Sequence, residues 1–361
     1  MKNALTKPSE TGASGNGFLQ IINKTVSKFS GNNFLLLITI VLFIVMYIIG
    51  IIAFRNANFG RLQVFLNLFI NNAGLIVAAA GMTMVMITAG IDISVGSVIG
   101  LTCMMLAYMM ERMSVPAWQA IIVVFLFGIV FGLVQGFLVA YLKIQPFIVT
   151  LAGLFFARGL TAVISPDMIS ISNPDFLALA NMKIMIPFGG YVNRQGVVNM
   201  PYIFPTVIMA LVVLAIMYIL LGRTRFGRDI YAIGGSEQSA ILMGLNVRRT
   251  KLLAYTLNGF LSTFAGFLFG LNSCAGFVEQ ARGFEIEAIS SAVIGGTMLT
   301  GGVGNVLGSL IGALIKGTIE TFITSAGTLS SWWTRIVISA LLCFFIVLQS
   351  IFVNIRAKSR L

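Results

Sequence analysis

The sequence predicts an all-α, polytopic membrane protein, and three observations carry that prediction. Of the 361 residues, 58% are hydrophobic and only 9% are charged, and the mean hydropathy is +0.98. One soluble core cannot bury that much apolar surface. Uncharged runs recur along the chain, and about twenty such residues suffice to cross a bilayer as a helix. The runs are continuous and lack the alternation of a lipid-facing barrel strand, so helical spans are favoured.

Glycines, prolines and charge clusters divide these runs into about ten predicted spans. The eighth is too short to cross alone, because Gly295-Gly296 and Gly301-Gly302 interrupt it, and we expect it to be partly re-entrant. An even number of spans returns the C-terminus to the side of the N-terminus. The predicted spans lie near 34–54, 64–89, 95–110, 116–142, 146–164, 201–221, 252–272, 288–299, 303–324 and 334–354.

The segments outside the spans predict the orientation of the chain. Residues 1–33 form a polar, cytosolic N-terminal tail without an apolar signal core, residues 34–354 one membrane domain, and residues 355–361 a cytosolic C-terminal tail. With both tails inside, fourteen Lys and Arg residues face the cytoplasm and six face the opposite side, as the positive-inside rule requires. The net charge of +12 is spread over short segments and forms no single basic patch, so a nucleic-acid partner is not predicted.

The residue types present give an enzyme little to work with. The chain has no histidine and no GxxxxGK[ST] phosphate loop, so neither His-based chemistry nor ATP binding through that motif is available. Its three cysteines show no CxxC spacing and are expected to be small core residues. We therefore expect no catalytic site, metal site or cofactor on this chain.

One carboxylate interrupts an apolar stretch in GIDISVGSVIG, residues 90–100. Because an ionisable group at membrane depth is costly, Asp92 must be solvated, hydrogen-bonded or close to a cavity. Asp92 or Ser94 would also suit the N-terminus of the third span as a cap for free N–H groups. A structural cap and a role in a transport path are both compatible with this pattern.

Further polar groups lie on the faces of the predicted spans. Asn71 and Asn72 in the second span, with Asn258 and Ser262 in the seventh, would suit transient contact with a polyhydroxylated solute. Hydrogen bonding between helices is the simpler interpretation of each one.

Three charges also fall within spans. Lys316 and Glu320 are four residues apart and are expected to pair, more as a structural contact than as a proton relay. Arg158 is expected to reach an interface or a group of carbonyls, without an assigned mechanism. Glycines at every fourth position in GIVFGLVQG and GNVLGSLIG predict close helix packing.

A basic island, Gly222–Lys251, separates two spans and contains a short helical pattern. Ser236 is a good N-cap, Glu237 lies in the first turn and Gly244 is a C-terminal stop, which predicts a helix of about two turns. A helix that short does not persist alone in water, so its apolar residues need a surface to pack on. The alternatives are a docking surface for a partner and an amphipathic helix on lipid. On the opposite side, the long loop 165–200 would be the first segment that an external partner meets.

Five segments resemble the membrane-spanning permeases of bacterial ribose/galactose-type ABC importers, with the nearest likeness to the galactofuranose-transporting members. They are YAIGGSEQSAILMGLNVRRTK, MVMITAGIDISVGSVIGL, IQPFIVTLAGLFFARGL, SSAVIGGTMLTGGVGNVLGSLIGALIKG and GTLSSWWTRI. They occur in order, and the resemblance extends from about Phe34 to Phe352.

This resemblance implies a permease of the bacterial cytoplasmic (inner) membrane with ten helices, similar to the vitamin B12-type (type II) importer fold. Implied partners are an ATPase with two nucleotide-binding domains, which would bind ATP and Mg, and an extracytoplasmic sugar-binding protein. A second copy of the chain or a paralogous permease would complete the pore, and membrane lipid would surround both subunits. The matching segment would be the ATPase-coupling helix, with Ser236, Glu237, Ala240, Ile241, Leu242, Met243 and Gly244 as docking candidates.

By more distant similarity to the same fold, the turns at residues 90–96 and 144–146 would border the cytosolic gate. The expected path or gate residues are Asp92, Ser94, Asn71, Asn72, Gln145, Asn258 and Ser262. The alternative function is an ion-coupled secondary transporter for a small polar solute, which would use a midplane carboxylate such as Glu320. A membrane scaffold without transport is a third option, and the sugar itself stays open.

Overall fold

The computed structural model describes residues 31–55, 58–192, 198–327, 330 and 332–358. The helices in this part are α2 (Gly31–Ala53), α3 (Leu62–Ile87), α4 (Val95–Glu111), α5 (Ala117–Ala140), α6 (Pro146–Ile164), α7 (Pro174–Asn181), α8 (Pro205–Arg223), α9 (Arg225–Gly235), α10 (Glu237–Leu242), α11 (Val247–Ser273), α12 (Phe284–Ile294), α13 (Val306–Ala326) and α14 (Trp332–Lys358). The strands are β1 (Ile169–Ser170), β2 (Ile184–Met185), β3 (Tyr191–Val192), β4 (Val198–Asn199), β5 (Tyr202–Ile203) and β6 (Ala275–Gly276).

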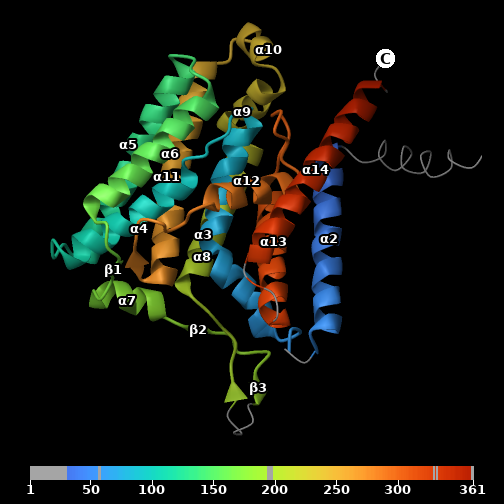
Figure 1. Cartoon of the computed structure of the whole chain (residues 1–361). Coiled ribbons are helices and arrows are strands. Elements are labelled where there is room, and N and C mark those ends of the chain that lie inside the picture. Colours follow the sequence, from blue (N-terminus) through green and yellow to red (C-terminus); the bar gives the residue numbers. More distant parts are fainter. Residues whose placement is uncertain (1–30, 56–57, 193–197, 328–329, 331, 359–361) are drawn as a thin grey trace, which may run out of the picture.

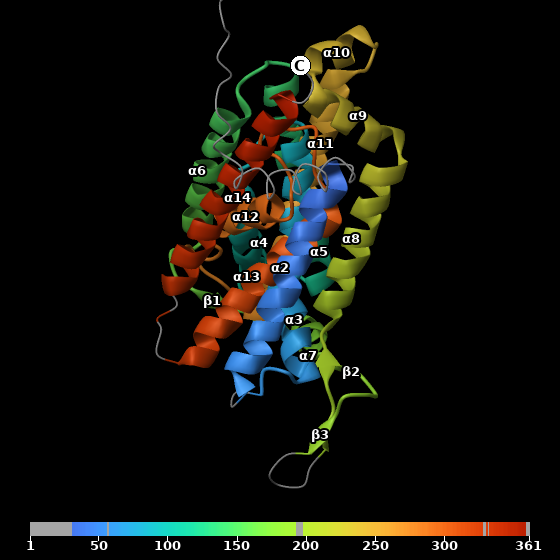
Figure 2. The same ribbon diagram turned by 90° about the vertical axis from the view of Figure 1, so that its right-hand side faces the viewer.

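The long helices run side by side, and short elements lie at both ends of the bundle (Figure 1, Figure 2). One end carries α10, and we call it the α10 face. The other end carries β2 and β3, and we call it the hairpin face. Helix α14 ends toward the α10 face, while α3 begins near the hairpin face and runs toward α10 (Figure 1).

Seven helices of the described chain are long and apolar enough to cross a membrane, namely α2, α3, α5, α6, α8, α11 and α13. Each of the ten predicted spans overlaps one helix, and the other three are α4, α12 and α14. Helix α12 has 11 residues, so it is about 16 Å long and spans roughly half of a 30 Å hydrocarbon core. The protein is therefore a mostly helical polytopic membrane protein.

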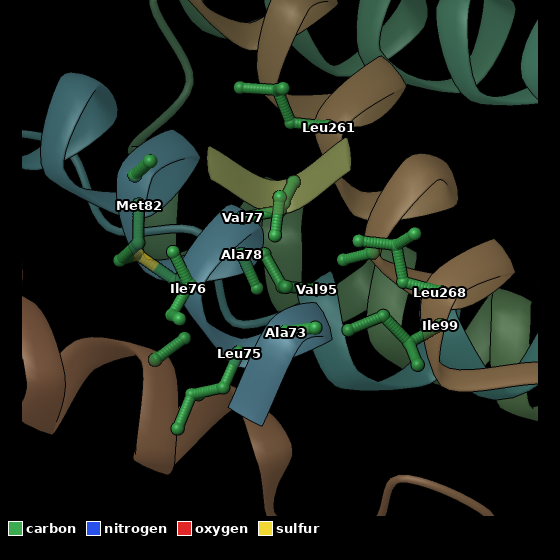
Figure 3. Close-up of a cluster of buried hydrophobic side chains, with 14 of the residues drawn as sticks. Ala73, Leu75, Ile76, Val77, Ala78, Met82, Val95, Ile99, Leu261 and Leu268 are labelled. Carbon is green, nitrogen blue, oxygen red and sulfur yellow. The ribbon is translucent and has the colours of Figure 1, made fainter. Parts of the chain in front are cut away.

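Helix α3 forms the centre of the bundle. Every residue from Asn72 to Ile87 is buried, and α3 packs against α8, α11, α12 and α13. Figure 3 shows part of this core, where Ile99 of α4 and Leu268 of α11 lie next to each other on one side of α3, while Leu75 and Met82 of α3 lie on its other side. Lipid tails are as apolar as these side chains, so close van der Waals contact is what holds the helices together.

Glycine stripes bring two pairs of helices into backbone contact. A side chain at Gly132 of α5 would collide with the carbonyl of Tyr255 in α11. In the same way, one at Gly308 of α13 would collide with the Gly295 carbonyl after α12. The predicted role of both stripes in tight helix packing is confirmed, because any larger residue would force the backbones apart.

The hairpin face corrects the expectation of a purely helical chain. Within the described ranges, three two-stranded antiparallel ladders form there or beside it: β1 with β6, β2 with β5, and β3 with β4. Helix α7 is capped by Asn173, whose side chain accepts hydrogen bonds from the amides of Asp175 and Phe176. The long loop 165–200 therefore contains elements of its own. The sequence signal was weak because two-residue strands carry no periodicity.

Arg158 of α6 fastens the segment between β6 and α12. Its Nη1 donates to the carbonyls of Val278, at 2.7 Å, and Gln280, at 2.8 Å. The expectation that Arg158 meets carbonyls is confirmed. A half-buried guanidinium with two acceptors satisfies part of its hydrogen-bonding demand without leaving the bundle.

Candidate functional site

The α10 helix follows directly from the capping pattern. The Ser236 side chain accepts a hydrogen bond from the Ser239 amide at 3.2 Å, and Glu237 lies in the first turn. Helix α10 ends at Leu242, and Gly244 then takes a φ of +78°, a conformation that glycine adopts without a steric cost. The helix has six residues, in agreement with the two turns that the sequence predicts.

Helix α10 is held to the bundle on one side only. Ala240 is fully buried and packs with Ile233 of α9 and Val247 of α11. Glu237 forms a salt bridge with Lys251 of α11, with 2.6 Å between Oε2 and Nζ. These contacts fix the orientation of α10 at the tip of the molecule (Figure 1).

The other side of α10 presents three apolar side chains to the surroundings. Ile241, Leu242 and Met243 are 57%, 88% and 66% exposed, and we call them the apolar triplet. Contiguous exposed apolar groups on a rigid support are typical of an interaction surface. The described part of the chain thus gives the short helix an anchor but leaves its apolar face uncovered.

A cavity of about 660 Å³ lies beside α10. Its wall includes the turn between α5 and α6, with Lys143, Gln145 and Pro146, and the start of α11 with Arg248. Gln145 therefore faces the α10 region, away from the other residues with which the sequence grouped it. Lys143 has a φ of +55°, a left-handed conformation in the turn at the α10 face from which α6 runs back toward the hairpin face (Figure 1).

The carboxylate of Asp92 lies between α3 and α4 and is 1% exposed. Its Oδ1 accepts hydrogen bonds from the Ser94 amide, at 2.9 Å, and from the Ser94 hydroxyl, at 2.6 Å. Its Oδ2 accepts one from Asn258 Nδ2 of α11 at 2.7 Å. Gln135 Nε2 of α5 donates to Ser94 Oγ at 3.0 Å. We call Asp92, Ser94, Gln135 and Asn258 the Asp92 cluster.

This geometry refines the predicted cap. Ser94 does occupy the N-cap position of α4, but its side chain accepts no hydrogen bond from the α4 amides. Asp92 instead receives the amide of Ser94, so the carboxylate stabilises the turn that precedes the helix. The same carboxylate binds α11, so it joins elements that are 166 residues apart in the sequence.

The α10 region and the Asp92 cluster are connected through the end of α3. Gly234 of α9 packs against the backbone of Ile87, with no room for a side chain. The Ile87 carbonyl also accepts a hydrogen bond from Gly302 N at 2.9 Å. Tyr231 of α9 donates from its hydroxyl to the Gly304 carbonyl at 2.8 Å. Helix α9, next to α10, thus rests on the residue that closes α3, five positions before Asp92.

Asn71 and Asn72 lie elsewhere, in the wall of a cavity toward the hairpin face. Asn72 is buried and donates to the Leu68 carbonyl at 2.9 Å, whereas Asn71 is exposed. Lys316 lies in the same wall and contacts two carboxylates, Glu320 at 2.8 Å and Glu287 at 3.2 Å. The predicted pair of Lys316 and Glu320 is therefore a three-membered cluster.

Known proteins are similar to this chain over most of its length. A family model described as the permease component of a branched-chain amino acid transport system matches residues 64–346. The inner membrane ABC transporter permease protein YjfF of Escherichia coli (strain K12) is 42% identical over 317 residues, 88% of this chain and 92% of that protein. The fructose import permease FruG of Bifidobacterium longum (strain NCC 2705) is 38% identical, with 87% and 89% covered. The ribose import permease RbsC of Escherichia coli (strain K12) is 35% identical, with 80% and 86% covered. No solved structure gives a significant match.

The chain belongs to this family of ABC import permeases. The matched region begins in α3 and ends in α14, so it contains α10, the Asp92 cluster and the cavity toward the hairpin face. The named relatives are transport subunits. The predicted membership in an ABC import permease family is therefore confirmed.

The structure brings together only part of the predicted path of this permease. Asp92, Ser94 and Asn258 meet in one cluster, and the Ser262 hydroxyl donates to the Asn258 carbonyl at 2.8 Å. Gln145, Asn71 and Asn72 do not join it. Two further residues near this cluster, Gln135 and Tyr255, were not predicted as path residues. The Tyr255 hydroxyl is buried without a hydrogen-bond partner among the described residues. A single glutamine within the glycine-rich apolar run of α5 was the available signal for Gln135.

Proposed function

We propose that this chain is the membrane-spanning subunit of an ATP-driven importer that carries a monosaccharide into the cytoplasm by alternating access. The observation that carries the proposal is the apolar triplet, because it is exposed on a helix that the bundle itself anchors and orients. Relatives named as ribose and fructose import permeases support the substrate class. We assign the substrate to the ribose, galactose and galactofuranose group.

The distribution of basic residues supports a cytosolic α10 face. The six Lys and Arg residues of the basic island belong to the segment that includes α10, and Lys143 lines the cavity beside α10 together with Arg248 and Lys251. Basic residues concentrate in the cytoplasmic loops of membrane proteins. In this orientation the chain lies in the bacterial inner membrane, both termini are cytosolic, and the hairpin face is extracytoplasmic.

We propose ten membrane-embedded helices arranged as in the vitamin B12-type importers. The overlap of ten predicted spans with ten helices supports this number. Helix α12 would enter the membrane without crossing it alone, and the turn after it would return toward the α10 face. That placement agrees with the contact between Gly302 and Ile87.

In the proposed mechanism, closure of the partner ATPase displaces α10, and the displacement reaches the pore through α9. The close contact of Gly234 with Ile87 would pass the motion to the end of α3. The Asp92 cluster joins this end of α3 to α4, α5 and α11, so these helices would move together. A path of this kind switches access without a tight solute site, which would impede release.

The assembly would contain more than this chain. The apolar triplet fits an ATPase with two nucleotide-binding domains, and ATP and Mg would bind to that partner. An extracytoplasmic sugar-binding protein would deliver the solute to the hairpin face. A second copy of the chain or a paralogous permease would form the other wall of the pore, and the exposed apolar helix faces would contact lipid.

Charge placed in the apolar triplet tests this proposal. The double substitution Leu242→Asp and Met243→Asp leaves the anchored face of α10 unchanged, but it should abolish copurification of the ATPase and lower ATP-driven uptake at least about a hundredfold. The matched control is Gln238→Asp, which adds a carboxylate on the exposed, polar part of the same helix. Both variants should insert equally well into the membrane.

Two outcomes would contradict the proposal. In the first, the doubly charged variant keeps its ATPase and its uptake. In the second, the chain reconstituted alone takes up solute under a proton or sodium gradient, which would favour an ion-coupled secondary transporter. Labelling of position 242 from the outside would also reverse the proposed orientation.

A further inference from the structure

The cavity toward the hairpin face is lined by charged side chains, amides and aromatic rings. It measures about 890 Å³, which lies within the range of small-molecule sites. Its charged residues are Glu279, Arg282, Glu287, Lys316, Glu320 and Arg335. Amides and aromatic rings complete the wall, among them Asn71, Asn272, Phe277 and Trp332.

The charges of this cavity cancel. Three carboxylates stand against three cations: Lys316 contacts Glu287 and Glu320, Arg282 contacts Glu279 at 2.6 Å, and Arg335 is the third cation. Lys316 is the most buried of these, with 11% of its side chain exposed, so the two carboxylates hold it in place. A cavity with fixed donors and acceptors but no net charge offers hydrogen bonds to a neutral polar solute and gives an ion no net attraction.

Trp332 supplies an aromatic surface at the rim. It is 68% exposed, and the Arg335 guanidinium lies 4.9 Å from the ring centroid. The ring offers a broad, exposed apolar area, while Arg335 and the acidic groups provide the polar partners. A monosaccharide has this same pair of surfaces, with C–H groups on the faces of the ring and hydroxyls around its edge.

We propose that this cavity is a transient site for a neutral monosaccharide, in which Trp332 contacts the sugar face and the Lys316 cluster contacts its hydroxyls. The inference rests on the proposed import function and deepens it, because it names residues on the hairpin side that would contact a released sugar. The adjoining cavity of about 300 Å³ shares Asn71, Asn72 and Glu320 and extends the polar wall along α3 and α13. The site is open to one side, which suits brief occupation.

Neighbouring tryptophans provide a matched test. Trp333 is 47% exposed on the same helix but does not line the cavity. The complete importer, with ATPase, binding protein and companion permease, is reconstituted in liposomes, and uptake of radiolabelled D-ribose and D-galactose is measured. Trp332→Ala should lower uptake about three- to tenfold, the loss expected for one aromatic contact. Trp332→Phe should retain most of the rate, and Trp333→Ala should match the wild type.

Two further readouts separate a sugar contact from a structural role. Assembly and binding-protein-stimulated ATPase activity should be unchanged in Trp332→Ala, so that less sugar is moved per ATP. In a chain with Trp118→Phe and Trp333→Phe, the fluorescence of the remaining Trp332 should change saturably with D-galactose or D-ribose and not with sodium chloride.

Equal uptake by Trp332→Ala and Trp333→Ala, or no saturable fluorescence change, would overturn the cavity assignment while leaving the import function intact. Parallel loss of assembly, ATPase activity and uptake in Trp332→Ala would also overturn it, since the residue would then be structural. Absence of ATP-dependent uptake by the wild-type importer for ribose, galactose and galactofuranose alike would instead overturn the proposed function, and this inference with it.

Discussion

The α10 helix exposes apolar side chains, whereas the Asp92 cluster buries polar ones. At the tip of the molecule, three large apolar side chains are exposed, whereas deep in the bundle a carboxylate, a hydroxyl and two amides are buried. Most polar groups of the buried set find their hydrogen-bond partners within the chain, and Asp92 alone accepts three hydrogen bonds. None of the described residues outside α10 covers the exposed set. The difference favours a stabilising role for the cluster, and it supports the proposal that a partner covers α10.

The largest effect is expected from a substitution that disrupts the buried Asp92 cluster. Asp92→Ala removes the shared acceptor and leaves donors on Ser94 and Asn258 without a partner in the bundle, so the free energy of unfolding should fall by about 3 kcal/mol. Thermal or denaturant unfolding of the purified protein in detergent measures the loss. Asp175→Ala, at an exposed position in α7, is the control and should cost less than about 1 kcal/mol. Equal losses would show that the cluster does not stabilise the fold.

A smaller, more selective effect is expected at the contact that joins the two regions. Gly234→Ala would press a methyl group against the Ile87 carbonyl, so α9 must shift relative to α3. Uptake should fall about tenfold while the ATPase still copurifies, because the apolar triplet is unchanged. Gly235→Ala is the matched control, since a methyl group there meets no other element within 4 Å. Wild-type uptake by Gly234→Ala would argue against the route through Ile87.

The smallest effect is expected at the salt bridge between Glu237 and Lys251. Glu237 is 51% exposed, so solvent screens the pair, and Glu237→Gln should lower the free energy of unfolding by no more than about 0.5 kcal/mol. Uptake measured in parallel should stay within about twofold of the wild type, because Ala240 still anchors α10. A loss as large as that of Asp92→Ala would mean that the salt bridge, and not Ala240, orients the helix.

Local chemistry made some of these features readable from the sequence. Ser236 and Gly244 bound α10 because a hydroxyl cap and a left-handed glycine act on neighbouring backbone groups. Helix α9 was not foreseen, since Gly234 and Gly235 suggest a break. The helix continues through them because Thr224 caps its start and Gly234 packs closely on α3.

The grouping of polar residues could not be obtained in the same way. Gln145 was placed with Asp92 and Asn258, but the turn at Lys143 directs it to the cavity beside α10. Glu287 was not linked to Lys316, which is 29 positions away in the chain and on another helix. Contacts between polar residues on different helices depend on how the helices cross, and the residue spacing along one helix does not encode the crossing geometry.

The sequence by itself determined that this protein is a helical membrane protein of the ABC import permease family, with a short capped helix in a basic segment. Hydrophobic run length, charge distribution and capping residues act locally, so each leaves its mark on adjacent positions. The tertiary structure decided that Asp92 binds Asn258, that α9 rests on Ile87 and that opposite charges meet around one cavity. These pairings arise where distant helices pack face to face, because a buried polar group must find its partner in space, wherever the chain happens to place it.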